Sequence, residues 1–74
     1  MKWNWYKLTL RQQQVALLVV EGKLNTFGMC RELGVSRSMF FLHLRNALKT
    51  LDIRYGRVQL AFEVGRHWKE MMDK

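Results

Sequence analysis

The sequence contains no proline, one cysteine and two histidines among its 74 residues. Cys30 alone cannot form an internal disulfide, and with only His43 and His67 beside it no structural zinc site can be assembled. The longest fully apolar run, Val15–Val20, is too short to span a bilayer, and no apolar segment of a secretory signal follows the first residues. We therefore expect a single small cytosolic domain over residues 1–74, with no metal, no cofactor and no membrane association.

Acidic residues are scarce and unevenly placed. There are 6 of them against 13 lysines and arginines, which gives a formal net charge of +7. None lies between Glu32 and Asp52, whereas Arg37, Arg45 and Lys49 do. A positive field attracts polyanions, and its concentration in one segment favours nucleic acid over a general role in solubility or attraction to a membrane surface. No nucleophile with a base, pair of carboxylates or phosphate-binding glycine loop is visible, so we do not expect an enzyme.

Capping residues and glycines mark the first two of four expected helices. Thr9 and Gln12 fit a capping box that opens a helix, and Gly22 supplies its left-handed stop. A short second helix is expected over about residues 26–33, with Gly34 as its stop. Its buried side is expected to comprise Phe27, Met29, Cys30 and Leu33.

The second half of the chain predicts two longer helices. Ser36 is a suitable N-cap for a helix that reaches about Leu51, and after a turn a fourth helix is expected over about residues 57–72. The short Gly34-containing turn before Ser36, with an apolar residue to fill the corner, is typical of a helix-turn-helix. No strand pattern occurs. The predicted fold class is therefore all-α, a four-helix helix-turn-helix domain whose third helix is the recognition helix.

The third helix has more apolar residues than one buried stripe requires. Its core side is expected to comprise Phe40, Leu44, Ala47, Leu48 and Leu51. The opposite side mixes cations, an amide, a hydroxyl and apolar groups, which suits the major groove of DNA. The predicted base contacts are Ser38, Phe41, Leu42, Arg45 and Asn46. The predicted phosphate contacts are Ser36, Arg37, Lys49, Arg54 and Arg57.

Phe41 and Leu42 have alternative explanations. Their side chains could pack against the aromatic segment that precedes the first helix, which we expect to be an arm over residues 1–7 that covers an open edge of the bundle. We favour packing slightly over base contact for Phe41, and exposure for Leu42. A third possibility is that both residues meet another protein, because exposed apolar patches commonly mark interfaces.

The fourth helix is apolar on two sides, which requires two partners. We expect one stripe to cover the core of the domain: Val58, Ala61, Phe62, Gly65 and Met72. We expect the other to form a homodimer interface: Leu60, Val64, His67, Trp68 and Met71. Gly65 costs helix propensity, so it is also a position where another backbone could approach closely.

Several of these residues fall in register with a known family. Leu8, Thr9 and Arg11, then Glu21-Gly22, the turn from Arg31 to Ser36, His43-Leu44 and Arg57 make residues 8–62 resemble the DNA-binding domain of LuxR–FixJ–GerE regulators. The resemblance implies four helices, a third helix in the major groove, dimer contacts through the fourth, and the existence of stand-alone members. The family's base-reading positions map to Phe41, Leu42 and Arg45, of which only Arg45 keeps the expected chemistry.

A second resemblance, to region 4 of bacterial sigma factors, is weaker because that region ends soon after its recognition helix.

The function we predict is a sequence-specific, double-stranded-DNA-binding transcription regulator that acts as a small homodimer. The alternative is a protein-interaction module that binds RNA polymerase or forms a heterodimer with another regulator. The two differ in their response to salt, because DNA binding releases counterions and an apolar protein interface does not.

Overall fold

A computed structural model describes residues 3–72, so residues 1 and 2 of the predicted arm and residues 73 and 74 of the predicted domain lie outside the described part. Within residues 3–72 there are four α-helices, one short 3-10 helix and no strand. The order is η1 (Asn4–Lys7), α1 (Leu10–Glu21), α2 (Thr26–Leu33), α3 (Arg37–Thr50) and α4 (Gly56–Met72). The all-α prediction and the four predicted helices are confirmed.

Caps fix the helix boundaries where the sequence predicts them. The Thr9 hydroxyl accepts a hydrogen bond from the backbone N–H of Gln12 at 3.1 Å, and the Gln12 amide oxygen accepts one from the N–H of Thr9 at 3.2 Å. Gly22 and Gly34 end α1 and α2 with φ values of 69° and 66°, a left-handed conformation that glycine adopts without steric cost. The capping box and both stops are therefore confirmed.

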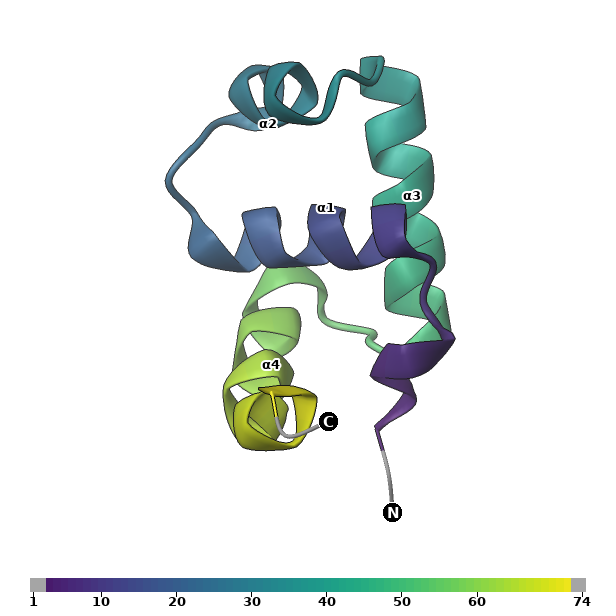
Figure 1. The fold of residues 1–74 in the computed structure, drawn as a ribbon, viewed down its shortest axis with the longest axis vertical. Coiled ribbons are helices and arrows are strands. Elements are labelled where there is room, and N and C mark those ends of the chain that lie inside the picture. Colours follow the sequence, from purple (N-terminus) through teal and green to yellow (C-terminus); the bar gives the residue numbers. More distant parts are fainter. Residues whose placement is uncertain (1–2, 73–74) are drawn as a thin grey trace.

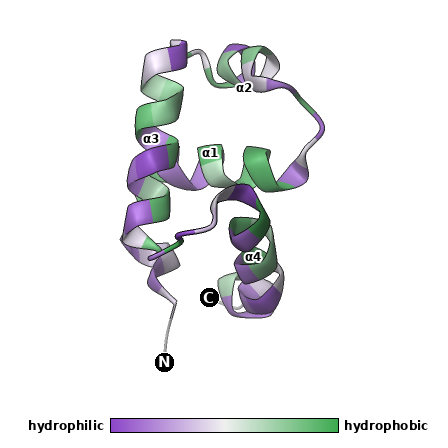
Figure 2. Ribbon diagram, turned by 180° about the vertical axis from the view of Figure 1, so that it is seen from behind, coloured by the Kyte–Doolittle hydropathy of each residue, from purple (hydrophilic) through white to green (hydrophobic). Residues whose placement is uncertain are grey.

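Helix α1 is the centre of the bundle and packs against all three other helices. In Figure 1, α3 stands upright along one edge, α1 crosses beside its middle, α2 lies above α1, and α4 lies below it. Hydrophobic residues dominate the second half of α1, and they alternate with hydrophilic residues along α3 (Figure 2). The helices α1, α2 and α4 all lie on one side of α3, so its other long side has no helix beside it (Figure 1). The core comprises Trp5, Leu8, Val15, Ala16, Val19, Met29, Phe40, Leu44, Ala47, Leu51, Ile53, Leu60, Val64 and Met71.

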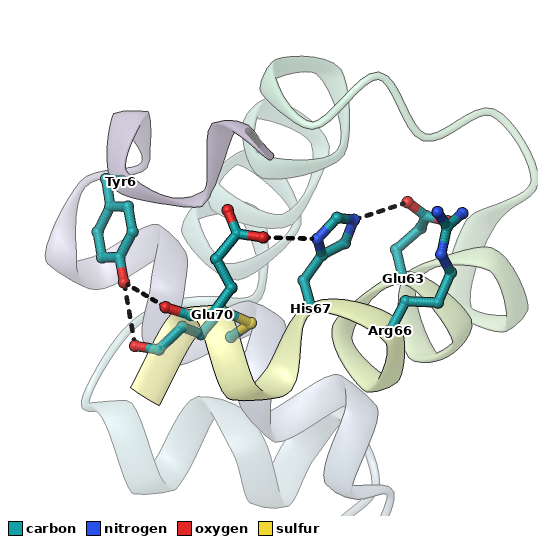
Figure 3. A network of polar contacts seen from close by, with 6 residues as sticks. Tyr6, Glu63, Arg66, His67 and Glu70 are labelled. Atoms are coloured by element: carbon teal, nitrogen blue, oxygen red, sulfur yellow. Dashed lines mark hydrogen bonds and ion pairs between the residues drawn. The ribbon is translucent and has the colours of Figure 1, made fainter. Parts of the chain in front are cut away.

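The aromatic arm closes the lower end of the bundle, as predicted. Trp5 is buried, and the Trp3 ring stacks on His67 with centroids 4.8 Å apart. The Tyr6 hydroxyl lies within hydrogen-bonding distance of two backbone carbonyls at the end of α4, at 3.1 and 3.2 Å (Figure 3). His67 itself lies between the carboxylates of Glu63 and Glu70. The arm and α4 therefore hold each other in place, although they are far apart in sequence.

The two apolar sides of α4 are reversed relative to the prediction. Leu60, Val64 and Met71 are buried in the core of the same chain, so their assignment to a dimer interface is wrong. His67, which was assigned to the same interface, instead stacks on Trp3 and lies beside the carboxylates of Glu63 and Glu70 in the same chain. Of the predicted interface only Trp68 is exposed. The stripe expected to cover the core is exposed instead: Val58, Ala61, Phe62, Gly65 and Met72.

Periodicity could not decide between these sides, because both are apolar and each forms a continuous helical stripe. The contacts of the aromatic arm distinguish the two sides. The side of α4 that carries the buried Val64 and Met71 also carries His67, on which the Trp3 ring stacks. A helix turned the other way would leave the Tyr6 hydroxyl and the Trp3 ring without these contacts.

Helix α2 also differs from its prediction at one residue. Met29 is buried and Cys30 and Leu33 are partly buried, but Phe27 is 72 % exposed. Residues two positions apart in a helix are separated by about 200° of rotation, so Phe27 and Met29 cannot both face the core. The expectation that Phe27 is a core residue is therefore wrong.

Candidate nucleic-acid interface

The start of α3 is set by the turn that precedes it. Gly34 adopts the left-handed conformation, and the N–H of Val35 returns to the carbonyl of Cys30 at 3.1 Å. The Ser36 hydroxyl then accepts a hydrogen bond from the N–H of Met39 at 3.1 Å, which makes it the N-cap of α3. The hydroxyl that was assigned to a phosphate thus has a structural role, and its proton remains free for a further acceptor.

The outward side of α3 collects the predicted base-contacting residues. Ser38, Leu42, Arg45 and Asn46 are all exposed, with Lys49 on the same side, while Phe40, Leu44 and Ala47 on the opposite side are buried. Leu42 is 46 % exposed, as expected. We call the exposed set Ser38, Leu42, Arg45, Asn46 and Lys49 the α3 face.

Phe41 lies at the edge of the α3 face and is also exposed. Its ring and that of Phe40 form a T-shaped pair with centroids 5.4 Å apart, and the guanidinium carbon of Arg37 lies 5.7 Å from the centroid of the Phe41 ring. The arm lies elsewhere, because Asn4 reaches the carbonyl of Thr50 at the other end of α3 and Trp3 stacks on α4. Packing of Phe41 against the arm, the slightly favoured explanation, is therefore wrong.

The α3 face is positively charged and electrically unpaired. Helix α3 contains Arg37, Arg45 and Lys49 and no acidic residue. Within residues 3–72, the ion pairs lie in the α3–α4 turn and on α4, and none involves α3. These cations are exposed and form no ion pair with a carboxylate of the described residues, so they are available to an external anion.

The turn after α3 adds two further cations. Arg54 and Arg57 are both exposed, and Arg54 forms a solvent-exposed ion pair with Asp52 at 3.8 Å. Gln59 organises this turn, because its amide oxygen accepts hydrogen bonds from the N–H groups of Arg54 and Tyr55 at 2.8 and 2.9 Å. This role of Gln59 was not predicted from the sequence. The pattern that could have indicated it is a Gln in the first turn of a helix, three residues after a Gly.

Arg11 is a second residue that positions a turn, although the sequence indicated it only through the family resemblance. Its guanidinium donates a hydrogen bond to the carbonyl of Leu33 at 3.0 Å and so ties α1 to the last turn of α2. This carbonyl end of a helix carries partial negative charge, which a cation stabilises. Arg11 thereby fixes the turn from which α3 begins.

Changing Arg11 to Met should lower the free energy of unfolding by about 1 kcal/mol, because the apolar stem is kept and only the charged hydrogen bond is lost at an exposed site. Urea denaturation followed by circular dichroism measures the change. Arg57→Met is the matched control, since Arg57 makes no hydrogen bond or ion pair within residues 3–72, and it should shift stability by less than about 0.5 kcal/mol. Equal shifts in the two variants would show that the Arg11 contact contributes nothing.

The chain matches no protein-family profile, no curated protein sequence and no solved structure. No helix among the described residues combines the length and the hydrophobicity that crossing a membrane requires. Residues 3–72 also bring together no group of three His, Cys, Asp or Glu side chains that could hold a metal ion. What the α3 face does must therefore follow from its own geometry and charge.

Proposed function

We propose that this protein is a sequence-specific, double-stranded-DNA-binding regulator of transcription. The observation that carries the proposal is the α3 face, where an exposed Arg, Asn and Leu stand together on a helix with no acidic residue. Arg45 can form a bidentate pair with guanine O6 and N7, and Asn46 can pair with adenine. Leu42 can pack on a thymine methyl group.

The arrangement of the helices supports this proposal. Helix α3 lies at the edge of the molecule, with α2 packed beside its start and the other helices on one side (Figure 1). Its 14 residues extend about 21 Å, and an α-helix fits the major groove of B-DNA. In this proposal α2, the Gly34 turn and α3 form the helix-turn-helix that the resemblance to LuxR–FixJ–GerE domains implies.

The remaining cations are assigned to the DNA backbone. Arg37 and Lys49 lie in the first and last turns of α3, and Arg54 and Arg57 continue the exposed basic surface into α4. Backbone contacts of this kind fix the register of a recognition helix but do not read sequence. The free proton of the Ser36 hydroxyl can also be donated to a phosphate oxygen.

Changing Lys49 to Gln tests this division of roles. The variant should bind specific and random duplexes more weakly by the same factor, and the slope of log K against log salt should fall by about one unit. Ser38→Ala, on the same face but uncharged, is the control that should leave the slope unchanged. Binding that is indifferent to salt in the wild-type protein would contradict the DNA proposal itself.

We place the homodimer contact on the outer α4 face, which comprises Val58, Ala61, Phe62, Gly65, Trp68 and Met72. Val58 is 81 % exposed and Phe62 62 % exposed, so an apolar stripe runs along α4 with no cover from residues 3–72. A Cβ atom added at Gly65 would meet no atom of residues 3–72 within 4 Å beyond the backbone of its own helix and its chain neighbours, so the internal packing does not require a glycine there. A second copy of α4 approaching at Gly65 would explain both features.

A protein-interaction module is the second candidate, favoured by one observation. Met39, Phe41 and Leu42 are all substantially exposed within four consecutive positions of one helix, which is more apolar surface than phosphate and base contacts require. Such a module would bind RNA polymerase or another regulator through α3. Its binding would survive high salt, whereas duplex binding would not.

A further inference from the structure

A groove lies along the outer side of α2, apart from the α3 face and from the outer α4 face. It has a volume of about 710 Å³ and extends from the start of α2 across the Gly34 turn to the first residue of α3. Its apolar lining is provided by Phe27, Cys30 and Val35. The fold gives this groove no role, and of its lining residues only Arg37 is among the proposed DNA contacts.

The charge of the groove has one sign. Arg31 and Arg37 line it, and no acidic residue does. Neither guanidinium forms an ion pair within residues 3–72, where the ion pairs lie in the α3–α4 turn and on α4. Two unpaired arginines beside an apolar floor complement a ligand that carries both a carboxylate and an apolar group.

Phe27 is the feature that the packing of the domain leaves unexplained. Its ring is 72 % exposed although α2 has a buried side at Met29, so the core gains little from an aromatic residue at this position. Exposed aromatic side chains next to a hollow are typical anchors of protein interfaces, as are arginines. The ring therefore identifies the kind of group that would fill the groove.

We infer that the α2 groove binds an acidic segment of a partner protein, with one aliphatic or aromatic side chain of that segment placed against Phe27 and its carboxylates paired with Arg31 and Arg37. A DNA backbone would satisfy the arginines but has no apolar side chain to cover Phe27. A neutral apolar peptide would cover Phe27 and leave both guanidiniums unpaired. An acidic peptide with an apolar anchor satisfies both halves of the groove.

The test begins with selection of short random peptides displayed on phage against the wild-type chain, followed by affinity measurement on the enriched peptides by fluorescence anisotropy. The enriched peptides should contain several Asp or Glu residues around at least one Leu, Ile, Phe or Trp. Phe27→Ala and Arg31→Glu should each weaken their binding about tenfold or more. The matched controls Phe62→Ala and Lys69→Glu make the same changes on α4 and should alter binding by less than about twofold.

Cys30 provides an independent readout, since it is the only cysteine in the chain and lines the groove. A saturating enriched peptide should slow alkylation of Cys30 in the folded protein. Enriched peptides that lack acidic residues, that are indifferent to Phe27→Ala and Arg31→Glu, or that leave alkylation unchanged would overturn the inference, as would a failure to enrich any peptide.

Binding of a random duplex, measured in parallel, separates this inference from the DNA proposal. Phe27→Ala should leave duplex affinity within about twofold, because the ring is not on the α3 face. A tenfold loss of duplex binding would instead assign the groove to the DNA surface and would overturn the peptide inference, while the DNA proposal would stand.

Discussion

Replacing Val64 with glutamate should unfold this protein. Val64 is 3 % exposed and lies in the core with Leu60 and Met71. The substitution removes the buried apolar area of valine and places an ionisable carboxyl group in the core, and each change costs about 2 kcal/mol or more. A domain of 74 residues has about 4–11 kcal/mol of stability in total, at roughly 0.05–0.15 kcal/mol per residue. We expect the loss to exceed about 4 kcal/mol.

Phe62→Glu is the matched variant on the other side of the same helix. Phe62 is exposed, and its ring contacts only the exposed Arg66 guanidinium at 5.8 Å among the described aromatic and cation contacts. This variant should stay helical and lose less than about 0.5 kcal/mol, yet sediment as a monomer where the proposed homodimer of the wild type sediments as a dimer, because two like charges would meet near the two-fold axis. Thermal denaturation and sedimentation at micromolar concentration give both results. A folded Val64→Glu variant, or a dimeric Phe62→Glu variant, would contradict the assignment of the two sides.

Changing Arg45 to Ala should remove the largest single share of sequence discrimination. Arg45 is exposed at the centre of the α3 face and forms no ion pair within residues 3–72, so its guanidinium can form a bidentate pair with guanine. The variant should lose about 1–3 kcal/mol on the specific site, roughly 5- to 150-fold in affinity, and relax the preference at one base pair. The stability of the variant should change by less than about 0.5 kcal/mol, since Arg45 is exposed.

Competition between specific and random duplexes measures this effect. Asn46→Ala, at the neighbouring position, should relax the preference at a different base pair. If Arg45→Ala lowers affinity for specific and random duplexes equally, Arg45 contacts phosphate only, and the sequence reading must come from other residues.

The helix boundaries could be predicted because local chemistry determines them. Thr9, Asn25 and Ser36 each satisfy free N–H groups at a helix start, and Gly22 and Gly34 adopt a conformation that other residues avoid. These interactions span three or four residues, so they are visible in the sequence. The composition of the α3 face could be predicted for the same reason, since helical rotation alone separates Leu42 and Arg45 from the core.

What could not be predicted depends on contacts between distant segments. The choice between the two sides of α4 depends on where the arm places Trp3, and nothing within α4 records it. Phe27 was assigned to the core because it is apolar, whereas an apolar residue can equally be part of a binding surface. Arg11 acts through a hydrogen bond to a backbone carbonyl of another helix, 22 residues along the chain, which no residue pattern reveals.

The central claim is that the α3 face reads double-stranded DNA, and selection of bound sites from random duplexes tests it most directly. With the full chain at moderate salt, the enriched sequences should share a motif whose information is lost at one position with Arg45→Ala. If the protein acts as the proposed homodimer, the motif should be two-fold symmetric, with half-sites about one helical turn apart. An output pool indistinguishable from the input, bound with no dependence on salt, would contradict the account.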